Sequence, residues 1–189
     1  MSVDMVEEIK EVKADEKYPI LAIRRVWPVG EEIHCAINLI KPQSTELCKI
    51  SAGEDTFESV AYHLGCGLAT LYMGFTVKTE EDKKILEDEQ TSFDKMMAVT
   101  RDYAGYVITK FHPGLPRNIH IWQVSILPKY QNTTLRNIGL RELEKRFKEN
   151  GTEEITMESM REGWHEDAAK LGFVETFTKY RKSLKQQGV

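Results

Sequence analysis

The sequence of 189 residues lacks several signatures that would assign a protein to a common class. Its three cysteines, Cys35, Cys48 and Cys66, form neither a C-x-x-C motif nor an even set, so we expect reduced thiols in a cytosolic setting. No apolar run approaches the roughly 18 residues that span a bilayer, so no contact with a membrane is predicted. The net charge of -4 at pH 7 argues against a nucleic-acid partner.

Motifs for nucleotide, hydrolase and metal chemistry are absent as well. There is no G-x-G-x-x-G, no G-x-x-x-x-G-K-[ST] and no G-x-S-x-G. The histidines lack metal-ligand spacing with the cysteines, so no metal site is predicted. The acidic run 79–90 could bind a divalent metal or a cationic substrate, but its interleaved lysines favour a solvated helix face.

What is present is the pattern of one globular domain. We expect a flexible tail over 1–17, followed by a single domain over 18–189. Alternating apolar residues predict strands near 18–26, 95–100, 104–112, 118–127, 154–160 and 173–182. Segments with helical spacing predict helices near 56–73, 79–92, 134–150 and 163–171. This order predicts an α+β fold (mixed α/β) whose twisted sheet is mostly antiparallel and flanked by helices.

Two local features of the first half bear on structure and chemistry. A short helix over 31–40 should stop before Pro42, because proline is disfavoured inside a helix, which makes 41–51 a loop. On the helix expected over 56–73, His63 and Cys66 are three residues apart and so could meet. A catalytic Cys–His pair is one interpretation, and a buried thiol beside a histidine at the core edge is the favoured one.

The most informative stretch runs from 118 to 151. A strand rich in β-branched and aromatic residues is followed by a short turn and then by a helix that Gly151 ends. Asn132, Thr133 and Thr134 are all candidates to cap that helix. Backbone N–H groups at the start of a helix form a ready site for an anion, although an ordinary strand-to-helix connection with a basic face explains the same residues.

Three segments resemble the GNAT superfamily of acyl-coenzyme A-dependent N-acyltransferases. The stretch from Val124 to Gln131, with Pro128, Tyr130 and Gln131, is similar to the fourth strand and coenzyme turn of that family. Downstream, Lys170-Leu171-Gly172-Phe173 resembles the K-L-G-F before its last strands, and 95–112 resembles its second and third strands. The resemblance covers 95–182 well and the N-terminal half weakly.

The sequence departs from the family pattern at four positions. Thr134 and Arg136 stand where the family has the two glycines of the coenzyme loop. Ala168 stands where it often has a tyrosine general acid, and Arg161 where it often has an asparagine. The resemblance in fold is therefore better than the resemblance in catalytic residues.

The resemblance implies a site for acetyl-coenzyme A on the central strand and the turn after it. Backbone amides of Ile126 and Leu127 are the candidates for holding the thioester carbonyl, and the turn would hold the pyrophosphate through Gln131, Asn132, Thr133, Thr134, Leu135 and Arg136. His120 could act as a general base, because its ordinary pKa suits neutral pH, although a structural strand histidine is the simpler reading.

Two functions from different classes follow from these residues. The first is an N-acyltransferase that moves an acetyl group from acetyl-coenzyme A to an amine-bearing substrate. The second is a GNAT-fold protein that no longer catalyses and binds a protein partner, as a structural or interaction module in, for example, a phage particle or a multiprotein assembly. The expected setting is the cytoplasm, which for a viral protein means the host cytoplasm or the virion.

Overall fold

The computed structural model describes residues 20–50, 55–112, 115–131, 134–157, 169 and 172–174. The chain divides into two compact units, 1–158 and 159–189, and every element named below belongs to the first. In chain order these elements are β1 (Ile20–Val26), α1 (Gly30–Ile50), α2 (Phe57–Gly65), β2 (Thr70–Val77), α3 (Glu80–Glu87), α4 (Phe93–Val99), β3 (Asp102–His112), β4 (Leu115–Ile126), α5 (Pro128–Gln131), α6 (Thr134–Glu149) and β5 (Glu154–Met157).

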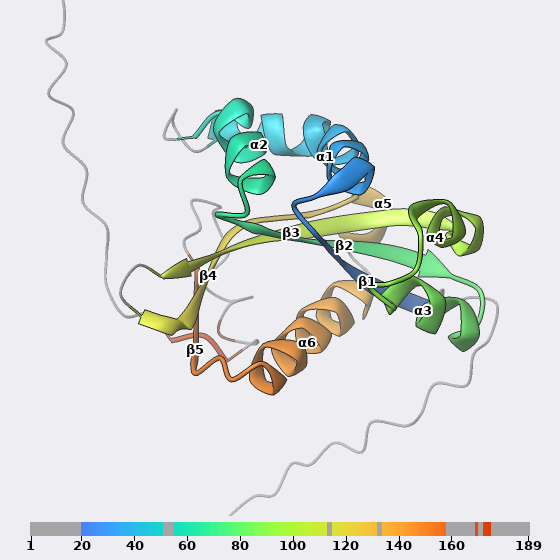
Figure 1. Cartoon of the computed structure of the whole chain (residues 1–189). Coiled ribbons are helices and arrows are strands. Elements are labelled where there is room, and N and C mark those ends of the chain that lie inside the picture. Colours follow the sequence, from blue (N-terminus) through green and yellow to red (C-terminus); the bar gives the residue numbers. More distant parts are fainter. Residues whose placement is uncertain are drawn as a thin grey trace, which may run out of the picture. The chain divides into compact units, whose positions relative to one another are not determined.

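The strands form one sheet in the order β1-β2-β3-β4-β5. Neighbours from β1 to β4 pair antiparallel, and β5 alone is parallel to its neighbour β4. Helices α1 and α2 lie on one face of the sheet and α6 on the other (Figure 1). The predicted mixed, mostly antiparallel sheet flanked by helices is confirmed, as are the strands near 18–26, 104–112 and 118–127 and the helix near 134–150.

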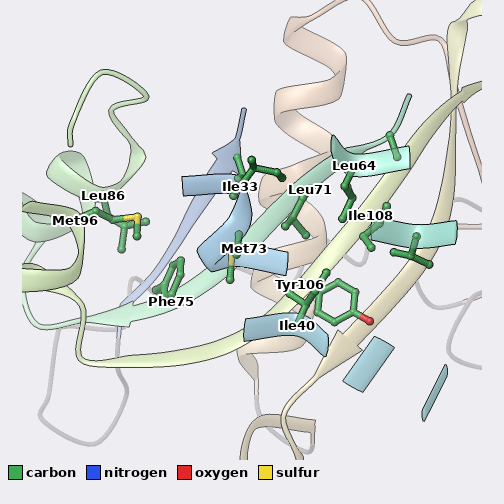
Figure 2. Packing of buried hydrophobic residues seen from close by; sticks show 14 of the residues in the cluster. Ile33, Ile40, Leu64, Leu71, Met73, Phe75, Leu86, Met96, Tyr106 and Ile108 are labelled. Carbon is green, nitrogen blue, oxygen red and sulfur yellow. The ribbon is translucent and has the colours of Figure 1, made fainter. Parts of the chain in front are cut away.

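The larger core fills the face that α1 and α2 cover. Ile33 and Ile40 of α1 and Leu64 of α2 meet alternate residues of β2 and β3, and Figure 2 shows this packing. On β2 the residues of this core are Leu71, Met73, Phe75 and Val77, a period of two that Ala69 extends just before the strand. The core extends under α3 and α4 through Leu86 and Met96.

A smaller core holds α6 against the other face. Leu143 and Phe147 of α6 pack on Ile23, Val107, Ile119 and Ile121. The helix ends in a Schellman motif: Gly151 has φ of +79°, its N–H donates to the carbonyl of Lys148, and the N–H of Thr152 donates to that of Phe147. The predicted stop at Gly151 is therefore confirmed.

The expected loop over 41–51 is wrong, because α1 continues through Pro42 to Ile50. The buried positions of this helix are Ile33, Ala36, Ile40, Ser44 and Cys48, which follow one face without interruption across the proline. Burial of that continuous face outweighs the one backbone hydrogen bond that proline removes.

The single helix expected over 56–73 is also wrong in its second half. α2 starts as expected, with Thr56 as N-cap accepting from the N–H of Ser59 at 3.2 Å, but it ends at Gly65. Gly67 then adopts φ of +69°, which allows the chain to turn into β2. The same region also corrects the buried thiol expected beside His63, since Cys66 is exposed.

The strand expected over 95–100 is a helix instead. Ser92 caps α4 by accepting from the N–H of Lys95, and only Met96 of this helix is fully buried. The second strand of the sheet is thus β2 and not the segment after Lys95.

The other expected elements are confirmed in part or lie outside the described residues. The helix near 79–92 covers Glu80–Glu87, and the strand near 154–160 is described to Met157. The tail over 1–17, the helix near 163–171 except residue 169, and the strand near 173–182 beyond residue 174 lie outside the described residues. Among the described helices, none is long and apolar enough to cross a bilayer.

Candidate functional site

Among the described residues, strand β4 has a neighbour on both sides along only part of its length. It pairs with β3 from Leu115 to Ile126, but with β5 only from Asn118 to Ile121. In the described part of the chain, the segment after Ile121 is therefore bordered by β3 on one side only. A strand with an unpaired side presents a row of N–H and C=O groups that can bind a ligand.

A bulge at Trp122 directly follows Ile121, the last residue of β4 that pairs with the described part of β5. Ile108 pairs with Gln123 and Thr109 with Ile121, so Trp122 has no residue opposite it. Before the bulge Ile119 and Ile121 face α6, whereas after it Val124 packs on that side. A bulge that redirects side chains in this way is common beside functional sites.

The bulge also turns Gln123 into the larger core. Its Oε1 accepts hydrogen bonds from the hydroxyls of Ser44 at 2.9 Å and Tyr106 at 3.1 Å. The bonds tie β4 to α1 and to β3. We conclude that a buried polar group helps to hold the shape of β4 beyond the bulge.

The two backbone amides proposed from the sequence point in different directions. The N–H of Leu127 donates to the carbonyl of Ala104 at 2.9 Å, so it faces β3. Successive residues of a strand point to opposite sides, so the N–H and carbonyl of Ile126 face the side that β5 leaves open. The carbonyl confirms this direction, because it accepts from Nε2 of Gln131 at 3.0 Å and not from β3.

A short turn joins this open segment to the start of α6. α5 is a single helical turn, and α6 begins at Thr134, which is exposed, followed by the buried Leu135. A small apolar cavity of about 60 Å³ lies between the first turns of α6 and the end of β4, with Val124, Ile126 and Leu135 in its wall. Asn132 and Thr133 lie outside the described residues.

Several solved structures that resemble this chain are described as acetyltransferases. An aminoglycoside acetyltransferase from an uncultured soil metagenomic sample, in complex with sisomicin, has a TM-score of 0.55 at 11% identity, covering 87% of this chain and 97% of its own. The chain has the GNAT fold. No protein-family model matches the sequence, and no curated protein matches it.

Two further structures with the GNAT fold show how far the likeness extends. A protein described as a predicted acetyltransferase, from Clostridium acetobutylicum with acetyl-CoA, has a TM-score of 0.53 at 13% identity over 87% of this chain and 97% of its own. A ribosomal-protein-alanine N-acetyltransferase from Brucella melitensis biovar Abortus 2308 has a TM-score of 0.54 at 10% identity. The match covers 87% of this chain and 99% of that protein's chain. These likenesses span the N-terminal half, where the sequence resemblance was weak.

In this chain, the turn after β4 is anchored by a carboxylate that sequence reasoning missed. Asp102, at the start of β3, forms an ion pair with Lys129 and accepts a hydrogen bond from the Tyr130 hydroxyl at 2.8 Å. The Lys129 ammonium holds the pKa of Asp102 below its ordinary value. No local pattern marks Asp102, because its partners lie 27 and 28 residues away.

We expect Asp102→Asn to lower the free energy of unfolding near neutral pH but not in acid. The pKa of Asp102 in the folded protein lies below its ordinary 3.8. The ionised Asp102 carboxylate therefore stabilises the folded protein above that value. This stabilisation is lost as the pH falls through the lower pKa of the folded protein. Urea unfolding of both proteins from neutral to acid pH checks this, and a difference that is constant with pH would contradict it.

Arg136 and Gln131 occupy different places in the turn. Arg136 is half-buried, with Nε 3.4 Å from the side-chain oxygen of Asn137, and it borders the small cavity. Gln131 is exposed and folds back onto β4 through its bond to Ile126. Arg136 therefore places a positive charge in the first turn of α6, whereas the Gln131 side chain bonds back to the end of β4.

His120 lies where β4 and β5 still pair. It is half-buried, and its Nδ1 is 3.1 Å from the hydroxyl oxygen of Thr156, its pairing partner on β5. Because Ile119 and Ile121 face α6, strand alternation places the His120 side chain on the opposite face. It stands two residues before the bulge, at the edge of the opening.

A second group of side chains missed from the sequence surrounds Trp122. Its indole Nε1 donates to Asp55 at 2.9 Å, the ring of His63 meets it edge-on at 5.2 Å between centroids, and the Lys110 ammonium lies 2.9 Å from its centroid. Burial lowers the pKa of Lys110. A carboxylate beside an aromatic face is a suitable environment for a cation, and here Lys110 occupies it.

Proposed function

We propose that this protein is an N-acyltransferase that moves an acetyl group from acetyl-coenzyme A to an amine. The observation that carries the proposal is the direction of the Ile126 backbone. Its N–H faces away from β3, toward the side of β4 that the described residues of β5 leave open, directly before the turn into α6. The GNAT fold supports the proposal, since the acetyltransferases named above share it at 10–13% identity.

Different residues of the site would have different roles in acyl transfer. Acetyl-coenzyme A supplies the acyl group as an activated thioester. The Ile126 N–H would stabilise negative charge on the thioester carbonyl oxygen, as amides do in an oxyanion hole. Arg136 and the amides of residues 132–136 would bind the pyrophosphate at the start of α6. Gln131 would act by positioning, since its side chain holds the Ile126 carbonyl.

The amine side of the site is proposed on the face that carries Trp122. The substrate amine must lose a proton before or during attack, and His120, six residues before Ile126 on β4, is the candidate base that the sequence suggested. Its Nδ1 is held by Thr156, which would orient the ring. Asp55 and Trp122 would attract the cationic form of an amine, as they attract Lys110 in this structure.

Calorimetric titration of acetyl-coenzyme A into three proteins tests the coenzyme site. We expect the wild type to bind and Arg136→Gln to bind about tenfold or more weakly, because one charge-assisted contact to phosphate is lost. Lys145→Gln is the matched control, since Lys145 is exposed later on the same helix. Absence of heat from the wild type, or equal affinity of all three proteins, would contradict the proposal.

The alternative is a GNAT-fold protein that has lost coenzyme binding and serves as a structural or interaction module, for example in a phage particle. It is favoured by Thr134 and Arg136 at the usual glycine positions and by the small volume of the adjoining cavity, about 60 Å³. The double variant Thr134→Gly/Arg136→Gly separates the two. An enzyme should lose affinity for acetyl-coenzyme A, whereas a closed site should gain binding that the wild type lacks.

A further inference from the structure

A second cavity lies at the opposite end of α6 from the proposed coenzyme site. Its volume is about 680 Å³, within the range typical of ligand sites. Its walls come from the last residues of β1, β3 and α6 and from the first residues of β2 and β4. It shares no lining residue with the small cavity at the start of α6.

The cavity exists because α6 stops before it covers the whole sheet. Gly151 ends the helix and the chain turns away toward β5. Phe147, in the last turn, meets the Tyr72 ring edge-on at 5.5 Å between centroids, and these rings form an aromatic wall. The small side chains of Thr70 and Thr109 leave the neighbouring space open and line it with hydroxyls.

One cation in this cavity has a donor without a partner. Nε of Arg25 is buried and, in the part of the chain that the structure describes, has no hydrogen-bond partner. The guanidinium carbon lies 4.1 Å from the centroid of Trp27, so one flat face of the group is covered, and Arg25 lies in the wall of the cavity. The second arginine of the cavity, Arg117, is already paired with Glu153.

The chemistry of the walls selects the kind of anion. A buried guanidinium N–H without an acceptor is costly, and a ligand oxygen would satisfy it. With Arg117 paired and the Lys110 ammonium over the Trp122 ring, one guanidinium and the threonine side chains suit a singly charged carboxylate better than a phosphate, which would need more cations. The Tyr72 and Phe147 rings suit a flat apolar body.

We propose that this cavity binds a small organic acid with a flat ring, its carboxylate against Arg25 and its ring against Tyr72 and Phe147. The acyl transfer proposed above makes no use of these residues. The site therefore stands apart from that function and can be tested independently of it.

The test uses the full-length protein and two probes that differ only in charge, 2-naphthoate and its neutral counterpart 2-naphthamide. We expect the wild type to bind the naphthoate about tenfold or more tightly than the amide, and Arg25→Gln to bind the two about equally. Arg101 is exposed and directly precedes the first residue of β3, at the other end of that strand from the cavity. Arg101→Gln should therefore retain the wild-type preference. Equal binding of both probes by the wild type, or an unchanged preference in Arg25→Gln, would overturn the proposal.

Two further measurements keep the test decisive if Arg25→Gln folds poorly. Asn150 is exposed at the mouth of the cavity, and Asn150→Trp should fill it and abolish naphthoate binding. Saturating acetyl-coenzyme A should leave the affinity for naphthoate unchanged, because the two sites share no residue. Naphthoate binding that survives Asn150→Trp, or that acetyl-coenzyme A displaces, would place the probe elsewhere and overturn the proposal.

Discussion

Replacing Arg24 with methionine is expected to lower the free energy of unfolding by about 3–5 kcal/mol, the usual cost of removing one partner from a buried ion pair. Arg24 is only 1% exposed, and its Nε and Nη2 donate to the two carboxylate oxygens of Glu32 at 3.0 and 3.2 Å. The guanidinium also donates to the backbone carbonyls of Leu86, Asp88, Glu89 and Thr91. One side chain thus joins β1 to α1 and to the segment between α3 and α4.

A double-mutant cycle separates the ion pair from the carbonyl contacts. Arg24→Met leaves Glu32 mostly buried without its cation, whereas Arg24→Met/Glu32→Leu removes both charges. The double variant should therefore be less destabilised than the sum of the two single variants. It should still be less stable than the wild type, because the carbonyls of Leu86, Asp88, Glu89 and Thr91 lose the guanidinium as a donor. Urea unfolding followed by tryptophan fluorescence measures this.

Arg141→Met, on the exposed side of α6, is the control for that cycle and should change stability by about 0.5 kcal/mol or less. Additive effects of Arg24→Met and Glu32→Leu would mean that the two charges do not support each other. A loss below about 1 kcal/mol for Arg24→Met would show that this contact network contributes little to the fold.

The parts of the fold that the sequence predicted are those whose signals are local. The strand, turn and helix from 118 to 151 are set by β-branched residues, by helical spacing and by Gly151, all of which act within a few residues. In contrast, α1 continues through Pro42 because Ser44 and Cys48 are buried against distant parts of the chain. Propensity at the proline could not reveal that burial.

The helix expected over 70–73 was wrong, and a pattern in the sequence could have corrected that expectation. Ala69, Leu71, Met73, Phe75 and Val77 alternate strictly, but the apolar spacing of α2 can be extended across Gly65 and Gly67 without a gap. Reading Gly67 as a turn would have separated the two patterns, and its φ of +69° shows why a glycine stands there.

The candidate site shows the same division between local and distant causes. The sequence identified the segment from Ile126 to Arg136, but not that Leu127 is bonded to Ala104 while Ile126 faces the opening. That difference depends on the register between β3 and β4, which is set by a bulge at Trp122. Asp102 was missed for the same reason, since only strand pairing brings it to Lys129 and Tyr130.

Gly105→Ala is expected to lower the free energy of unfolding by about 1–3 kcal/mol and to weaken acetyl-coenzyme A binding about tenfold or more. Gly105 pairs with Ile126 across β3 and β4. A Cβ built on it would lie 2.9 Å from the Cα of Ile126 and closer still to the carbonyl oxygen of Ser125. Both contacts are with backbone, so β4 must move where the Ile126 N–H is proposed to act.

The matched control for this change lies directly across the sheet. Gly74 pairs with Gly105 on the other side of β3, but a Cβ there would meet its neighbours at ordinary distances of 3.5 to 3.9 Å. Gly74→Ala should therefore keep the wild-type stability, or gain about 0.4–1 kcal/mol by restricting the unfolded chain, and should bind the coenzyme as before. Calorimetry on both variants, each shown by circular dichroism to be folded, gives the comparison. If Gly105→Ala is destabilised yet binds acetyl-coenzyme A like the wild type, the coenzyme does not contact this part of β4 and the role proposed for Ile126 is wrong.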